Sequence, residues 1–170
     1  PELEPVVAAS TDLDTVDEAG LCEGKAHCLY FTYPETPQAG EDCLVFLNRA
    51  SSGVLRDRPQ VKLLLSFNGW EVPGDAYALR PPEARKDEFS DWWCCRSAVD
   101  ARAYEMNFVF HDEEGNFENN GGQDFCQAVS GETTRASWLA SAKEREAELE
   151  EVRRREEEEE EAARHARRLE

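Results

Sequence analysis

The sequence predicts an all-β sandwich followed by a long charged C-terminal α-helix. Two features of the central part of the chain indicate the sandwich. Several short segments alternate apolar and polar residues with the period of a β-strand, and loops rich in proline, glycine and asparagine separate them. Composition indicates the helix, because the chain beyond Glu132 lacks glycine and proline and consists mainly of strong helix formers.

The chain is predicted to have three parts. Residues 1–22 are acidic and are interpreted as an N-terminal linker, although Thr11 to Ala19 can form a helical turn. Residues 23–131 carry nearly all the aromatic residues and form the predicted sandwich. Residues 132–170 form the charged helix, which i,i+4 pairs of glutamate and arginine support. Its apolar positions are too sparse for three clean heptads, so a solvated single helix, a coiled coil or partner helix, and disorder stay open.

The strand that organises the sandwich is predicted at residues 60–67. Its residues alternate, so one face is expected to be buried and to hold Val61, Leu63, Leu65 and Phe67. The strand leads directly into the turn dipeptide Asn68-Gly69. Two earlier strands are predicted at Leu29 to Tyr33 and at Cys43 to Asn48.

The second half of the sandwich begins with an irregular stretch. From Glu71 to Asp91 the chain is rich in proline, glycine and charge, and no regular element is predicted there. Three later segments are predicted as strands: 92–99, 105–111 and 124–129. Trp93 is expected in the core, and the middle segment is expected to point Met106, Phe108 and Phe110 inward. Residues 112–122 are predicted to form a loop.

The charge of the chain limits its partners. The 170 residues include 37 Asp and Glu against 19 Lys and Arg, which gives a formal net charge of -18. Nucleic acid and anionic membrane surfaces are not expected as partners, since both require positive potential, whereas a neutral polysaccharide is indifferent to this charge. No apolar run approaches the roughly 20 residues of a membrane span. The start at Pro1 without a basic, apolar leader indicates a mature form or a fragment.

The sequence contains no pattern that indicates catalysis, a cofactor or a metal site. The six cysteines include no CxxC pair, and Cys94 and Cys95 would point to opposite faces of a strand, so reduced thiols are expected. No nucleophile elbow, HExxH, P-loop or dinucleotide-binding glycine motif occurs. The carboxylates of Asp112 to Glu114 are interpreted as a solvated loop rather than an acid/base pair.

Aromatic and amide side chains beside turns indicate a sugar-binding site. Pyranose rings stack their apolar faces on aromatic rings, while their hydroxyl groups need fixed donors and acceptors at the ring edge. Trp70 follows the turn after the organising strand, and Phe117 lies in a loop with two asparagines. If the two loops converge, they form a platform of two rings edged with amides. The candidate glucan-binding residues are Trp70, Phe117, Asn119, Asn120, Asn68, Trp92 and Lys62.

Each candidate also has a structural interpretation that the sequence leaves open. Trp70 can be a lid over the core, and Phe117 can be a core residue. The segment Asn119 to Gly122 can be only a tight turn, because asparagine and glycine tolerate positive φ. Trp92 can pack at the edge of a sheet.

Four motifs, in order, carry a resemblance to a known family. They are CLVFLNRASSG, FNGW, DWWCC and MNFVFHDEEGNFENNGGQDF, and they lie within about residues 28–131. This stretch resembles the starch-binding modules in the N-terminal region of class III starch synthases, which are carbohydrate-binding module family 53 and are related to family 25. The resemblance implies an immunoglobulin-like antiparallel β-sandwich that binds α-1,4-glucan in a plastid.

The resemblance also implies roles for individual residues. Trp70 matches the family's stacking tryptophan, Phe117 matches its second stacking aromatic residue, and the paired asparagines match Asn119 and Asn120. At about Leu64, related modules carry a polar His or Arg. The leucine here offers no hydrogen bond to a sugar hydroxyl.

The predicted function is non-catalytic binding of starch, amylopectin or maltooligosaccharides. Such a module anchors a starch synthase or a granule-associated assembly to glucan and raises its effective concentration there. The alternative is an interaction scaffold with a degenerate sugar site, which binds a partner through residues 132–170. The 170 residues are not expected to act as an enzyme by themselves.

Overall fold

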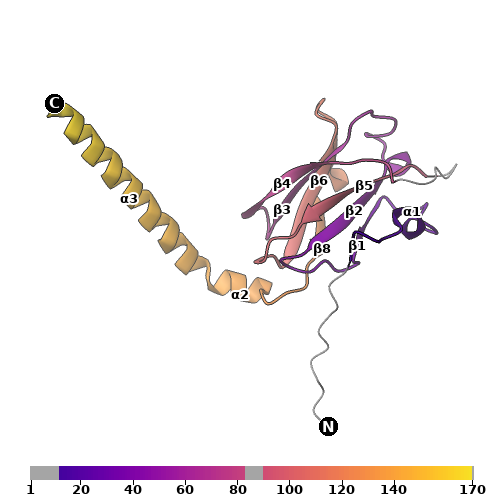
Figure 1. The fold of residues 1–170 in the computed structure, drawn as a ribbon, viewed down its shortest axis with the longest axis horizontal. Helices are drawn as coiled ribbons and strands as arrows, with labels where there is room; N and C mark the ends of the chain where they lie inside the picture. Colours follow the sequence, from indigo (N-terminus) through magenta and orange to yellow (C-terminus); the bar gives the residue numbers. More distant parts are fainter. Residues whose placement is uncertain (1–11, 83–89, 170) are drawn as a thin grey trace, which may run out of the picture. The chain divides into compact units, whose positions relative to one another are not determined.

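The computed structural model describes residues 12–82 and 90–169 (Figure 1). The chain divides into two compact units between Glu132 and Thr133. In the described ranges the first unit consists mostly of antiparallel strands, and the second consists of helices. Among the described residues, no helix combines the length and the apolar character required to cross a membrane.

The strands of the described ranges form two antiparallel sheets. The first sheet has the order β1-β2-β5, with the strands β1 (Tyr30–Tyr33), β2 (Asp42–Asn48) and β5 (Trp92–Ala98). The second sheet has the order β4-β3-β6-β7, and β8 also pairs with β6. Its strands are β3 (Lys62–Phe67), β4 (Val72–Ala78), β6 (Glu105–His111), β7 (Phe117–Glu118) and β8 (Phe125–Ala128). Short helices occur at α1 (Glu18–Leu21), η1 (Arg49–Ser51) and η2 (Asn120–Gly122).

Aromatic side chains join the two sheets. The ring of Tyr30 in β1 packs edge-on against Phe108 in β6, with centroids 5.3 Å apart, and against Phe125 in β8 at 5.0 Å. Edge-to-face pairs of this kind add about 0.5–1.5 kcal/mol to the burial of their area. The inward residues predicted for the two central strands are confirmed as buried: Val61, Leu63, Leu65, Phe67, Met106, Phe108 and Phe110.

The segment from residue 12 to residue 22 differs from the predicted linker. Its apolar side chains, Leu13, Val16 and Leu21, pack against a buried cluster on the first sheet that includes Phe46 and Trp92. Ion pairs join Asp14 to Arg96 and Glu18 to Arg80, each at 2.6 Å. Apolar residues spaced through an acidic stretch were the signal for this packing. The rest of the predicted linker, residues 1–11, lies outside the described residues.

Strand β4 lies in the stretch where no regular element was predicted. It pairs with β3 alone at the edge of the second sheet, which is where Pro73 is tolerated in a strand. Only glycine fits at position 74 without a clash, because a Cβ atom there would lie 2.4 Å from the carbonyl oxygen of Leu65. Proline and glycine therefore marked an edge strand with a bulge rather than a loop.

The two adjacent tryptophans of β5 exchange their expected places. Trp92 is 6% exposed and packs at 5.0 Å from Phe31, whereas Trp93 is half-buried and lies under the guanidinium of Arg49 at 4.1 Å. The prediction of Trp93 in the core was wrong: near the start of β5 its ring contacts the guanidinium of Arg49 and stays half-buried. Trp92 on the opposite face is buried because the segment around α1 packs over that face.

The cysteines are free thiols, as predicted. Burial raises the pKa of Cys22 to about 11 and the pKa of Cys43 to about 12. Both thiols are therefore protonated and weakly nucleophilic at neutral pH.

The second unit contains α2 (Arg135–Ala140) and α3 (Ala142–Arg168), which confirms the predicted charged C-terminal helix. A capping box between Thr134 and Ser137 begins α2. Ion pairs between successive turns, such as Glu151 with Arg155 at 2.7 Å, support α3.

Candidate functional site

Two aromatic side chains stand out at the surface of the first unit. Of the aromatic residues that the structure describes, only Trp70 and Phe117 are exposed, at 39% and 50% of their areas. Trp70 follows β3, and Phe117 opens β7, so both belong to the second sheet or its turns. An exposed aromatic ring that is held by a sheet offers a flat apolar surface to a ligand.

The turn between β3 and β4 presents Trp70. Asn68, Gly69 and Trp70 have successive φ angles of 54°, 70° and 68°, which lie in the left-handed region. Asparagine and glycine reach that region at little cost, whereas tryptophan does not, so other contacts must hold the turn.

Asn68 provides these contacts. Its Nδ2 donates to the carbonyl of Arg102 at 3.0 Å, and its Oδ1 accepts from the amides of Tyr104 at 2.9 Å and Glu105 at 3.4 Å. The next residue, Gly69, donates its amide to Oδ1 of Asn107 in β6 at 2.7 Å. The turn is thereby tied to the strand at the centre of the sheet.

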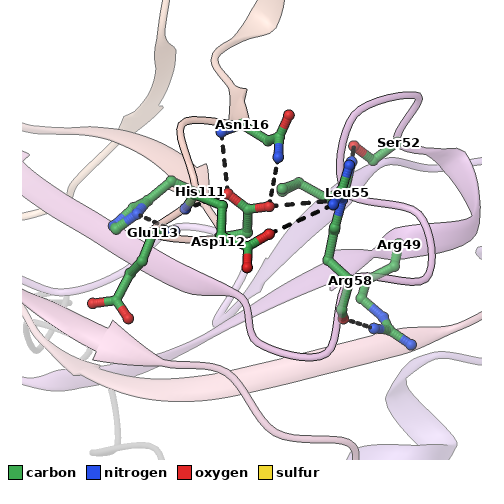
Figure 2. A network of polar contacts seen from close by, with 9 residues as sticks. Arg49, Ser52, Leu55, Arg58, His111, Asp112, Glu113 and Asn116 are labelled. Carbon is green, nitrogen blue, oxygen red and sulfur yellow. Dashed lines mark hydrogen bonds and ion pairs between the residues drawn. The ribbon is translucent and has the colours of Figure 1, made fainter.

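A polar network holds the loop that leads to Phe117 (Figure 2). Oδ2 of Asp112 accepts from Nδ2 of Asn116 at 2.7 Å, and Oδ1 accepts from the amide of Glu114 at 2.9 Å. The guanidinium of Arg58 lies 3.6 Å from the same carboxylate. Burial alone would raise the pKa of Asp112, but these hydrogen bonds and Arg58 lower it below its ordinary value. Asp112 is therefore an ionised anchor of this loop at neutral pH.

The paired asparagines shape the loop after Phe117. Oδ1 of Asn119 accepts from the amide of Gly122 at 3.1 Å, and Nδ2 of Asn120 donates to the carbonyl of Asp124 at 3.2 Å. Asn120 has a φ of 55° and also lines an open depression of about 530 Å3 beside Tyr30 and Phe125. Each asparagine thus uses one polar group of its side chain in a hydrogen bond within the loop.

The separation of the two loops follows from the positions of β6 to which they are attached. Asn107 holds the turn before Trp70, and His111 is the register partner of Phe117. Four residues of extended strand separate Asn107 and His111, which is about 13 Å. The two rings are thus carried at two ends of one sheet rather than in one narrow notch.

Lys62 and Leu64 lie on the strand between these ends. Lys62 is the register partner of His111, and Leu64 is the partner of Val109. Nζ of Lys62 pairs with Glu113 at 2.5 Å, and Leu64 is 39% exposed. We call these two residues, together with the exposed Trp70 and Phe117 of the same sheet and its turns, the aromatic platform.

Two candidates are not at this surface. Asn68 is 2% exposed, and all three of its side-chain hydrogen bonds go to the backbone of residues 102–105. Trp92 is buried on the first sheet under the segment around α1. Both side chains support the fold in this structure and offer no group to a ligand.

Three further residues shape the platform and were not among the predicted site residues: Asn107, His111 and Asp112. The polar residues of the β6 segment were the available signal. Their partners, however, come from the turn after β3 and from the loop after β6, so the alternation along one strand could not identify them.

Comparisons with known proteins give three similar starch synthases. The chain is 34% identical over 101 residues to soluble starch synthase 3, chloroplastic/amyloplastic, of Solanum tuberosum, which covers 59% of this chain and 8% of that protein. It is 30% identical over 120 residues to starch synthase 3, chloroplastic/amyloplastic, of Arabidopsis thaliana, which covers 71% of this chain and 11% of that protein.

The third relative is soluble starch synthase 3a, chloroplastic/amyloplastic, of Oryza sativa subsp. japonica. It is 34% identical over 124 residues, which cover 69% of this chain and 6% of that protein. The chain therefore spans about a tenth or less of the length of the curated relatives it matches. No family model matches the chain.

Proposed function

We propose that this chain is a non-catalytic module that binds α-1,4-glucan through the aromatic platform. In this proposal residues 23–131, with the segment around α1, are an immunoglobulin-like β-sandwich of carbohydrate-binding module family 53. Residues 132–170 are a charged helix that follows it. The observation that carries the proposal is the exposure of Trp70 and Phe117 on one sheet whose other aromatic residues are buried or half-buried.

The physical argument concerns how a sheet holds these rings. A buried aromatic side chain gains roughly 1.5–3 kcal/mol, so a ring left exposed forgoes that gain. Here the left-handed turn at Asn68 and the anchor at Asp112 hold both loops in place. In this proposal a glucan chain lies along the sheet and covers both rings with its sugar faces, because the positions of β6 that hold the two loops, Asn107 and His111, are about 13 Å apart along the strand.

Polar groups at the margin supply the hydrogen bonds. Asn119 uses its side-chain oxygen within the loop, which leaves its amide donor for a sugar hydroxyl. Asn120 uses its amide donor, which leaves its oxygen as an acceptor. The ammonium of Lys62 has three donors, of which one faces Glu113.

The relatives support the ligand class and the location. Their names place them in chloroplasts or amyloplasts and call them starch synthases. In our proposal the chain belongs to a plastid starch synthase and holds it on nascent glucan or on the starch granule. The net charge of -18 is compatible with a neutral polymer. With two rings and solvent-open hydrogen bonds, we expect a dissociation constant of about 10 µM to 1 mM.

The test compares Trp70→Ala with a matched control, Leu149→Ala, which also truncates an exposed apolar side chain but lies on α3. Affinity electrophoresis in amylopectin should show retardation of the wild type and the control. Trp70→Ala should lose at least about tenfold in affinity, as expected of a central aromatic contact. Phe117→Trp should bind more tightly, because a larger ring covers more of the sugar. Equal retardation of Trp70→Ala and the wild type would remove Trp70 from the site.

A second candidate function is an interaction scaffold. Leu149 and Val152 are exposed one turn apart on α3, and Leu64 places an apolar side chain within the platform. In that case the sandwich runs unretarded in amylopectin. Size-exclusion chromatography with light scattering then detects self-association of the wild type, and Leu149→Ala with Val152→Ala abolishes it.

A further inference from the structure

A row of three side chains crosses the platform at one end. Lys62 in β3, His111 in β6 and Phe117 in β7 are successive register partners on antiparallel strands. Directly opposed residues have Cβ atoms about 4.5–5.5 Å apart, so the three side chains are neighbours on one face of the sheet. His111 is half-buried and occupies the middle position.

The imidazole of His111 stacks on Phe117. The ring centroids are 5.4 Å apart, and the planes are inclined by 21°. The contact covers part of one face of the phenyl ring, while half of the Phe117 side chain stays exposed. A phenyl ring that rests on a second ring has fewer accessible orientations than a free one, so less entropy is lost when a sugar covers it.

The loop after β6 fixes the imidazole itself (Figure 2). The amide of Glu113 donates to Nδ1 of His111 at 3.3 Å. Nδ1 is therefore an acceptor, and the proton of the neutral ring lies on Nε2. Glu113 also holds Lys62 at 2.5 Å, so one turn residue ties together two members of the row.

We infer that His111 is a positioning residue for glucan binding: its ring sets the plane of Phe117 and leaves the opposite phenyl face for a sugar. The inference rests on the proposed function. It explains how a phenylalanine, with a smaller ring than tryptophan, serves as the second stacking residue. His111 positions Phe117 by stacking on its ring, so a side chain without a ring does not replace His111.

The test uses three substitutions of His111 in the full chain and maltoheptaose as the probe. His111→Ala and His111→Gln remove the ring and should each weaken binding about threefold to tenfold, the range expected for one aromatic pair. His111→Phe keeps the stack and should stay within about twofold of the wild type. His27→Ala is the control, because His27 is exposed before β1. Isothermal titration calorimetry measures the affinities, and urea unfolding confirms that each variant is folded.

A double-mutant cycle separates positioning from a general loss of structure. In a Phe117→Ala background, His111→Ala should change the affinity less than about twofold, because no ring remains to position. Equal losses in both backgrounds would overturn the inference, and so would a His111→Phe variant as weak as His111→Ala. Should the wild type bind no maltoheptaose, the proposed function itself fails. Binding that needs Trp70 but not His111 overturns only the present inference.

Discussion

Replacing Asn68 should destabilise the first unit far more than its size suggests. The side chain makes three partly buried hydrogen bonds to the backbone between residues 102 and 105. A typical hydrogen bond contributes about 1 kcal/mol net, and the contact at 3.4 Å contributes less. Asn68→Gly keeps access to the left-handed backbone and should therefore cost about 2–3 kcal/mol. Asn68→Ala adds the cost of a φ of 54° for a residue with a Cβ atom, about 1–2 kcal/mol.

Asn120 supplies a matched control. Its φ is 55°, close to that of Asn68, but its side chain is exposed and makes one hydrogen bond to Asp124. Asn120→Gly should therefore cost less than about 1 kcal/mol. The contrast between the two glycine variants separates the effect of the Asn68 side-chain hydrogen bonds from that of the backbone conformation.

Urea unfolding followed by tryptophan fluorescence measures the difference. With a urea slope of about 1–3 kcal/mol/M, a loss of about 2–3 kcal/mol lowers the midpoint by about 0.7–3 M. Asn68→Gly should also weaken glucan retention, since the turn that presents Trp70 loses its anchor. Equal midpoints for Asn68→Gly and Asn120→Gly would refute the assignment of Asn68 as the anchor.

Two further predictions concern the fold. Gly74→Ala should lower the free energy of unfolding by about 1–3 kcal/mol, because its Cβ would lie 2.4 Å from the Leu65 carbonyl oxygen. A Cβ atom at Gly53 would have nothing within 4 Å, so Gly53→Ala should leave the melting temperature unchanged. Equal melting temperatures for Gly74→Ala and Gly53→Ala would contradict the predicted clash at Gly74. Hydrogen bonds from Arg102 hold the pKa of Asp100 below its ordinary value of 3.8. The ionised carboxylate therefore stabilises the folded state above pH 3.8, and this contribution is lost as the pH falls towards the lower pKa of the folded state. Unfolding curves between about pH 6 and about pH 3 should show this loss, and Arg102→Met should reduce it; an identical pH dependence in the variant would count against the pair.

The sequence alone determined six of the strands in the described ranges and the change to helix, but it missed β4 and β7, which lie in stretches predicted as irregular. Alternation with period two has one cause, a strand with a buried face, so the segments around β3 and β6 could be assigned from the printed residues. A glutamate-rich stretch without glycine or proline likewise predicted α3. The exposure of Trp70 and Phe117 was one of the two options that the sequence left open.

Only the tertiary structure decided which polar and aromatic residues serve the fold. Asn68 and Trp92 have the chemistry of ligand-binding residues. Asn68, however, uses its side chain in hydrogen bonds to the backbone of residues 102–105, and Trp92 lies beneath the segment around α1. The structure identified His111 as a site residue because strand pairing places it between Lys62 and Phe117. These partners lie 49 residues before it and 6 residues after it in the chain. The reason is physical: a side chain is available to a ligand only if no neighbour has already taken its face or its hydrogen bonds, and most of those neighbours are set by strand pairing rather than by adjacent residues.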